Sequence, residues 1–205
     1  MESLARLDEV TRRLRRECPW DREQDARSIV PHTVEESYEL ADAVHSGDSE
    51  AMLDELGDVL FQVVFLSLLM EERGEGDLAA VAESCAAKLI RRHPHVYGDA
   101  EMESAGEVLA QWEEIKREVE GRSGDPLADI PQSLPALIYA RKVLRRTDPS
   151  GSSGAEKPGG PGAEPEERAA AEREVGELLL AAVRRSRELG VDPELALRAA
   201  ARRLA

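Results

Sequence analysis

The 205-residue chain contains little cysteine and few aromatic side chains, and these shortages exclude several classes of protein. Its two cysteines, Cys18 and Cys85, are far apart and lack the C-x-x-C spacing of a zinc site. We therefore expect reduced thiols in a cytoplasmic protein rather than a secreted disulfide scaffold. The N-terminus, Met1-Glu2-Ser3-Leu4, shows no basic segment followed by an apolar one, so we expect no signal peptide.

A long apolar run and an excess of positive charge are also missing. The longest apolar run, Val59–Met70, is interrupted by Gln62 and Ser67 and is too short to span a bilayer. The formal net charge is -15, which argues against binding to a nucleic-acid backbone. We expect neither a membrane nor a nucleic acid as partner.

Alternating β-branched runs are absent too, whereas apolar residues recur at helical spacing along most of the chain. The first such helix passes through Leu4 and Leu14 and stops at Cys18-Pro19, because proline disfavours helix in the residue before it. Short connections between the first five helices predict an all-α fold built as a helical bundle. Further helices are expected over residues 28–46, 48–73, 77–92, 105–120, 134–146, 167–189 and 193–204.

The most informative shortage is that of basic residues between Arg27 and Arg73, where eleven acids occur without any Lys or Arg. Five of these acids form the patterns Glu35-Glu36-x-x-Glu39 and Glu55-x-x-Asp58 on two predicted helices. Residues three apart share a helix face, and a Gly47-Asp48 turn would make the helices antiparallel neighbours. Four carboxylates then face one another. A hard divalent cation would neutralise them, and Mg2+ is the usual one where phosphate is the substrate.

Acidic runs on helices are more often solvated faces, and that alternative stays open at this point. Two features favour a site. A solvated helix usually carries Lys or Arg four residues from its acids, and here there is none. Asp58 also leads directly into the apolar run that starts at Val59, so the acids are expected to be partly buried, and buried carboxylates need a partner or a metal.

Basic residues reappear at the end of a later predicted helix, as Lys88, Arg91 and Arg92. Their position suits the helix dipole, which is the simple explanation. Beside an acid cluster they would also bind the outer oxygens of a metal-bridged polyphosphate, for which arginine supplies two-pronged donors.

The two tryptophans, Trp20 and Trp112, are expected in the core, with stacking on a nucleobase as the functional alternative. His93 and His95 flank Pro94 and are interpreted as hydrogen-bonding turn residues rather than metal ligands.

Four segments of the chain resemble segments of the MazG-type nucleoside triphosphate pyrophosphohydrolases and occur in the same order as in that family. The acid pattern resembles the E-E-x-x-E, E-x-x-D signature of that family. The other three segments are Cys18-Pro19-Trp20-Asp21-Arg22-Glu23-Gln24, the basic stretch of residues 88–99, and Trp112-Glu113-Glu114-Ile115-Lys116. The resemblance covers roughly residues 4–120.

The resemblance implies an all-α fold that forms a homodimer. It also implies Mg2+-dependent hydrolysis of a nucleoside triphosphate to the monophosphate and pyrophosphate, with Mn2+ as a substitute metal. Residue by residue, it makes Glu36, Glu39, Glu55 and Asp58 metal ligands. It places Lys88, Arg91 and Arg92 on the phosphates and Trp112 by the nucleotide. For Glu35 we expect a role in orienting or deprotonating the attacking water.

The C-terminal part departs from the family pattern of two related domains. Glu174-Val175-Gly176-Glu177-Leu178-Leu179 resembles the E-x-G-D-L-L of the second copy, but the second E-E-x-x-E helix is missing. We expect this part to bind no metal and to act in packing or assembly. The predicted organisation is a catalytic helical domain over 1–122, a connecting segment with a short helix over 123–147, a flexible Gly/Pro-rich linker over 148–166 and a degenerate helical remnant over 167–205.

Two other functions compete with this one. A narrower dUTP or dCTP pyrophosphatase, or a phosphoribosyl-ATP pyrophosphatase, would share the acid cluster, although the C-P-W-D and R-R-H-P-H segments favour the MazG type. A helical assembly module that binds divalent cations without turnover belongs to a different class, and the intact acid set together with the basic residues disfavours it.

Overall fold

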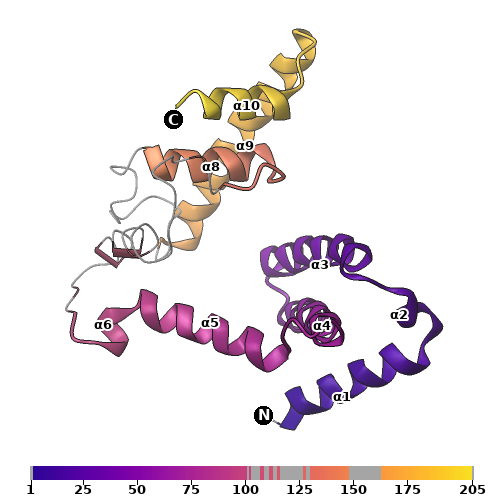
Figure 1. Cartoon of the computed structure of the whole chain (residues 1–205). Helices are drawn as coiled ribbons and strands as arrows, with labels where there is room; N and C mark the ends of the chain where they lie inside the picture. The colour runs from indigo at the N-terminus through magenta and orange to yellow at the C-terminus, as the bar shows by residue number, and fades with distance from the viewer. Residues whose placement is uncertain are drawn as a thin grey trace. The chain divides into compact units, whose positions relative to one another are not determined.

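The structure is a computed structural model that describes residues 2–100, 102, 107–108, 111–112, 115, 127, 130–147 and 163–204. Every regular element in this part of the chain is a helix, as the all-α prediction requires (Figure 1). The chain divides into two compact units, Met1–Leu89 and Ile90–Ala205, and each is described by itself. Among the described helices, none combines the length and apolar character needed to cross a lipid bilayer.

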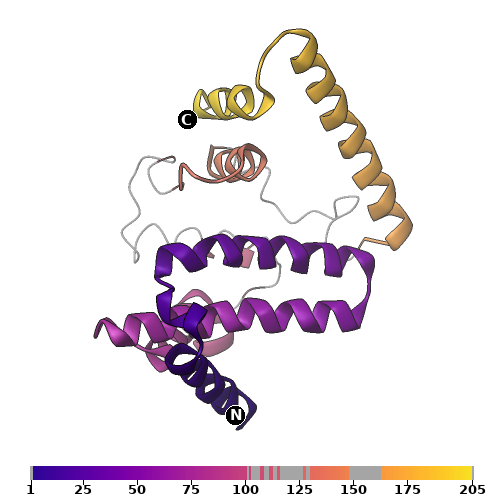
Figure 2. The same ribbon diagram turned by 90° about the vertical axis from the view of Figure 1, so that its right-hand side faces the viewer.

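The first unit is centred on an antiparallel pair of long helices, α3 (Ala26–Ser46) and α4 (Ser49–Glu72), which Figure 2 shows side by side. Gly47 ends α3 with a φ of 72°, a left-handed conformation in which glycine carries no steric penalty. Asp48 then caps α4, because its side chain accepts hydrogen bonds from the backbone N–H groups of Glu50 and Ala51. The predicted turn between the two helices is confirmed.

The core of this unit lies at the far end of the pair from that turn. Ile29 of α3 packs there with Phe65 and Leu69 of α4. The helix α1 (Glu2–Glu17) packs against α4 as well, and the short α2 (Pro19–Glu23) packs against α1. The C-terminal half of α4 is therefore the most buried part of the unit, which agrees with the apolar run that begins at Val59.

Two local predictions in this unit are corrected by the structure. The α3 helix begins at Ala26 rather than near Ser28, because Asp25 and Ser28 form a reciprocal capping box. As a result, Pro31 lies inside the helix rather than in its first turn. The sequence predicts that the first helix stops at Cys18-Pro19 and predicts no helix directly after it. The structure has the short α2 there, with Pro19 at the first helical position, where its missing N–H costs little.

The helix α5 (Leu78–Arg92) continues the first unit and crosses into the second, where α6 (Pro94–Tyr97) follows it. None of its residues is buried, and none of the other described helices packs against it. The predicted helix over 105–120 lies mostly outside the described residues, although the described members 107, 108, 111, 112 and 115 are helical.

The second unit pairs α8 (Ala136–Thr147) with α10 (Pro193–Arg202), and α10 also contacts α9 (Pro165–Glu188). Tyr139 and Val143 of α8 are fully buried against Ala201 of α10. The side chain of Glu194 accepts a hydrogen bond from the backbone N–H of Ala136 at 2.6 Å, so α10 caps the first turn of α8. The predicted linker over 148–166 lies largely outside the described residues, as does the predicted boundary at residue 122.

Candidate metal centre

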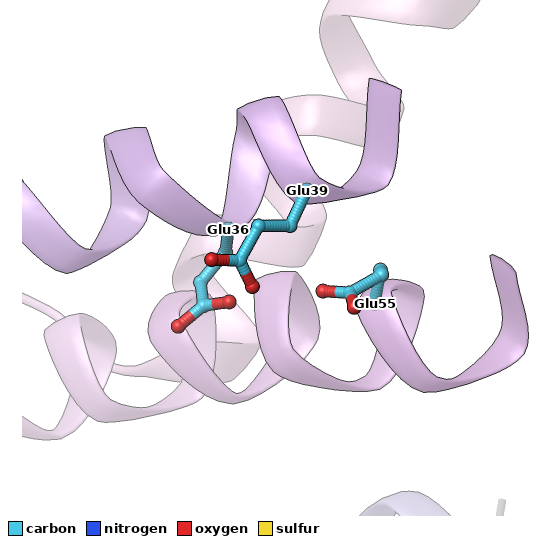
Figure 3. A group of neighbouring side chains, drawn as sticks. All are labelled: Glu36, Glu39 and Glu55. Atoms are coloured by element: carbon cyan, nitrogen blue, oxygen red, sulfur yellow. The ribbon is translucent and has the colours of Figure 1, made fainter. Parts of the chain in front are cut away.

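Three of the predicted metal ligands lie together between α3 and α4. Glu36 and Glu39 come from α3 and Glu55 from α4, and Figure 3 shows their carboxylates pointing toward one another. One oxygen atom of each lies within 4.8 Å of the others. Glu39 is exposed, whereas Glu36 and Glu55 are partly buried.

The register of the two helices explains this arrangement. Ile29 packs against Phe65 in the core. Because the helices run antiparallel, a step of seven residues, or about two turns, along each of them leads to Glu36 on α3 and Asp58 on α4. A further three residues on each helix leads to Glu39 and Glu55. The hydrophobic contact at one end therefore sets the acids opposite one another.

Asp58, the fourth predicted ligand, lies outside the group of three, but its charge acts on that group. Burial raises the pKa of Glu36, and the charges of Asp58, Glu39 and Glu55 raise it further. Burial also raises the pKa of Glu55, followed by the charges of Glu39 and Asp58. Like charges and lost water both disfavour ionisation, so the cluster holds its negative charge at a cost to the fold.

No basic side chain offsets this charge within the described residues, since none of the four acids forms an ion pair with Lys, Arg or His there. The Oε2 atom of Glu55 is buried and has no hydrogen-bond partner among the described residues. A buried carboxylate oxygen without a donor is costly unless something binds it. The group of three thus has the donor chemistry of a hard-cation site, in which every ligand atom is an oxygen.

Glu35, the predicted catalytic residue, lies next to the cluster in sequence but is held differently. Its Oε2 atom lies 3.2 Å from Nδ1 of His32, one turn earlier on α3, and its side chain is 65% exposed. The ring of His32 in turn meets the ring of Trp20 edge-on, with 5.8 Å between centroids. The default expectation of a core position for Trp20 is not met, because this side chain is half exposed.

The predicted phosphate-binding residues are not brought to the acids within the first unit. Lys88 is exposed on α5, which packs against neither α3 nor α4. Arg91 and Arg92 belong to the second unit, as does Trp112. The ring of Trp112 is partly buried and meets that of His93 edge-on at 5.0 Å.

Sequence reasoning treated Gln62 only as an interruption of an apolar run, and its burial was not predicted. It is 6% exposed and follows Asp58 by one helical turn. That four-residue spacing was a usable signal, because it continues the acidic stripe of α4 into the core.

Comparison with known proteins agrees with the family suggested by the motifs. Residues 24–97 match the family described as MazG nucleotide pyrophosphohydrolase domain, a range that includes all four acids and the basic residues of α5. A nucleoside triphosphate pyrophosphohydrolase from Escherichia coli strain K12 is 38% identical over 98% of this chain and 83% of its own length. A nucleoside triphosphate pyrophosphohydrolase/pyrophosphatase MazG from Thermotoga maritima is 38% identical over 91% of this chain and 75% of its own length.

A solved structure was also found, the crystal structure of a MazG-related protein from Thermotoga maritima. It is 24% identical and gives a TM-score of 0.49, over 56% of this chain and 99% of that one. The extent and identity of the two curated relatives decide the assignment. The chain belongs to the MazG family of nucleoside triphosphate pyrophosphohydrolases.

Proposed function

We propose that this protein hydrolyses nucleoside triphosphates to the nucleoside monophosphate and pyrophosphate, and that it requires Mg2+ for the reaction. The observation that carries this proposal is the group formed by Glu36, Glu39 and Glu55, whose oxygens converge within 4.8 Å without a basic partner among the described residues. A fully solvated acidic face does not describe this group, because Glu36 and Glu55 are partly buried and the Oε2 atom of Glu55 is buried without a partner among the described residues. The named relatives are nucleoside triphosphate pyrophosphohydrolases, which supports the same reaction.

The residues present fit a divalent cation. Glu36, Glu39 and Glu55 would hold it, with Asp58 adding charge from one side, and the buried Oε2 of Glu55 would gain the partner that it lacks. When bound, such a cation lowers the pKa of water and neutralises charge on the phosphates. Mn2+ accepts the same oxygen ligands and is expected to substitute for Mg2+.

The attacking water needs a base near the α-phosphate. We assign this role to Glu35, whose carboxylate is exposed and is oriented by its contact with His32. The water adds to the α-phosphorus, its proton passes to Glu35, and the bond to the bridging oxygen breaks to release pyrophosphate. No Ser, Cys or His nucleophile is required.

The leaving pyrophosphate needs cations on its outer oxygens. Lys88, Arg91 and Arg92 supply them in this proposal, and Trp112 lies beside the nucleotide. They follow the acid cluster in the matched region or just beyond it, at 88–92 and 112, but within the first unit nothing brings Lys88 to the acids.

A homodimer is part of this proposal. The helix α4 exposes the apolar side chains of Leu53, Leu56 and Leu60, and α3 exposes those of Val34 and Tyr38. The three leucines recur at intervals of three and four residues, the spacing by which a helix packs along another helix. A second copy packed on these leucines would complete a four-helix bundle.

The test is pyrophosphate release from a panel of standard, deaminated and oxidised nucleoside triphosphates and their deoxy forms, with Mg2+ or with EDTA. We expect equal amounts of monophosphate and pyrophosphate with Mg2+ and none with EDTA. A preference for dUTP or dCTP alone would point to the narrower pyrophosphatase. A folded protein that binds Mg2+ and turns over no nucleotide would overturn the proposal in favour of a cation-binding assembly module.

A further inference from the structure

Gln62 is a buried polar residue whose side-chain oxygen has no partner. The residue is 6% exposed, and its Oε1 atom is buried and makes no hydrogen bond to the described residues. Of the two buried polar residues in the apolar run of α4, the other is Ser67, whose hydroxyl donates to the carbonyl oxygen of Val63 at 2.8 Å. Ser67 is therefore satisfied by its own helix, whereas Gln62 is not.

The position of Gln62 places it beside the acid cluster. It follows Asp58 by four residues and precedes Phe65 by three, so the three share one stripe of α4. Phe65 packs against Ile29 of α3, which fixes that stripe as the side facing α3. Gln62 thus lies between the hydrophobic core and the carboxylates.

An unpaired amide oxygen at such a position disfavours folding. A buried carbonyl oxygen that loses its hydrogen bond to water and gains none costs free energy, and an apolar side chain of similar size would remove that cost. Gln62 and Asp58 lie one helical turn apart, a rise of about 6 Å along the axis of α4. A water molecule bound between polar groups can hydrogen-bond on both sides. A donor supplied from the Asp58 side would satisfy Gln62.

We propose that Gln62 is a positioning residue of the cation site, because its Oε1 atom accepts a hydrogen bond from a water molecule bound beside Asp58 when the cation is present. This inference rests on the proposed function. Small hard cations such as Mg2+ keep several of their water molecules in proteins, and groups that orient those waters tune the affinity of the site. Gln62 would thereby link cation binding to the packing of α3 on α4.

The experiment compares the wild-type chain with Gln62→Met, which keeps the length and volume of the side chain and removes the acceptor. The matched control is Ser67→Ala, a buried polar residue on the same helix with an internal partner. Calorimetric titration with Mn2+ measures the dissociation constant, and circular dichroism in EDTA measures the Tm of the metal-free protein. We expect Gln62→Met to weaken Mn2+ binding by about 10- to 100-fold, the range for residues that support metal ligands.

The metal-free Gln62→Met protein is expected to have a Tm at or above that of the wild type, by about 2–4 °C if one unpaired polar group is removed. Ser67→Ala is expected to bind Mn2+ as the wild type does. A dissociation constant of Gln62→Met within twofold of wild type would overturn the inference. So would a Tm in EDTA that falls further than that of Ser67→Ala, because Gln62 would then have a partner in the metal-free fold.

Failure of the proposed function would look different. It would leave the wild-type chain without Mn2+ binding, or with binding but without release of pyrophosphate. The Gln62 inference fails alone when the wild type binds Mn2+ and turns over substrate and Gln62→Met binds equally well.

Discussion

The two ends of α4 carry acids in opposite situations. At the C-terminal end, Glu71 and Glu72 are each held by an arginine of α1, with Arg12 Nη1 at 3.0 Å from Glu71 and Arg15 Nε at 2.8 Å from Glu72. At the N-terminal end, Glu55 and Asp58 face Glu36 and Glu39 without a basic partner among the described residues. We call the C-terminal end of α4 the balanced end, because arginines offset its acidic charge. The N-terminal end, where no basic residue among the described ones does so, is the unbalanced end.

The pKa values show what this difference means. The hydrogen bond from Arg15 lowers the pKa of Glu72, so the paired carboxylate favours the fold when it is ionised. Burial and neighbouring acids raise the pKa of Glu55, so this carboxylate opposes the fold when it is ionised. Acids that serve the fold are paired within the chain, and acids left unpaired in a partly buried place are candidates for binding something from outside it.

The largest expected effect comes from breaking the unbalanced end. Glu39→Gln removes a ligand charge from the cluster, and we expect pyrophosphate release to fall about 100-fold or more, since even residues that only support metal ligands cost 10- to 100-fold. Glu71→Gln makes the same chemical change at the balanced end and should leave kcat within a few-fold of wild type. Steady-state assays at saturating Mg2+ measure both variants.

Equal loss in both variants would contradict the comparison, because it would trace the effect to the stability of α4 rather than to the cluster. Circular dichroism of each variant in EDTA provides the control for folding. Glu39→Gln is expected to be no less stable than wild type there, since it removes one of the mutually repelling charges.

Breaking the balanced end should reduce stability instead. The guanidinium of Arg15 binds Glu72, donates to the carbonyl oxygens of Asp21 and Gln24, and lies 5.9 Å from the centre of the Phe65 ring. Arg15→Met leaves these acceptors without their donor, and we expect a loss of about 2–3 kcal/mol in the free energy of unfolding, measured by urea denaturation.

Arg13→Met is the matched control for that substitution, because among the described residues Arg13 pairs only with the exposed Glu17 of the same helix. Its urea midpoint should equal that of wild type. If Arg13→Met and Arg15→Met shifted the midpoint equally, the contact between α1 and α4 would not be the source of the stability.

The sequence predicts the unbalanced end of α4 but not the balanced end. The acids were visible because they occur in a long stretch without Lys or Arg, and because helical spacing puts Glu36 and Glu39 on one face. Their convergence with Glu55 followed from a Gly47-Asp48 turn, which the structure contains.

The balanced end was not predictable in the same way. Arg15 and Glu72 are separated by 57 residues, so no local spacing connects them. The contact depends on α1 folding back along the end of α4, which is a consequence of tertiary packing. Likewise the burial of Gln62 depends on which side of α4 faces α3, and this becomes certain only from the contact of Ile29 with Phe65.

The smallest expected effect, and the one that sharpens the comparison most, is the pH dependence of the metal-free protein. The pKa of Glu36 and that of Glu55 are raised above the ordinary value of 4.5, so the folded state binds more protons than the unfolded state above that pH. Stability therefore falls as the pH rises from 4.5 through the raised pKa values. The pKa of Glu72 is lowered, so its contribution is lost as the pH falls below 4.5.

Measuring the Tm in EDTA below and above pH 4.5 tests both expectations, the loss of stability on the acid side and the loss on the neutral side. Glu36→Gln should flatten the fall in Tm above pH 4.5 and leave the acid side unchanged, whereas Arg15→Met should flatten the acid side and leave the other unchanged. A wild-type Tm that rises from pH 4.5 to 7 in the absence of metal, with Glu36→Gln showing the same rise, would mean that the cluster does not oppose the fold.

The most direct test of the unbalanced end as a cation site is Mn2+ binding followed by electron paramagnetic resonance, in the wild type, Glu39→Gln and Glu71→Gln. We predict saturable Mn2+ binding by the wild type, displaced by Mg2+, retained in Glu71→Gln and lost in Glu39→Gln. Binding that is absent from the folded wild type, or equally strong in Glu39→Gln, would contradict the central claim that the unpaired carboxylates of α3 and α4 hold the cation.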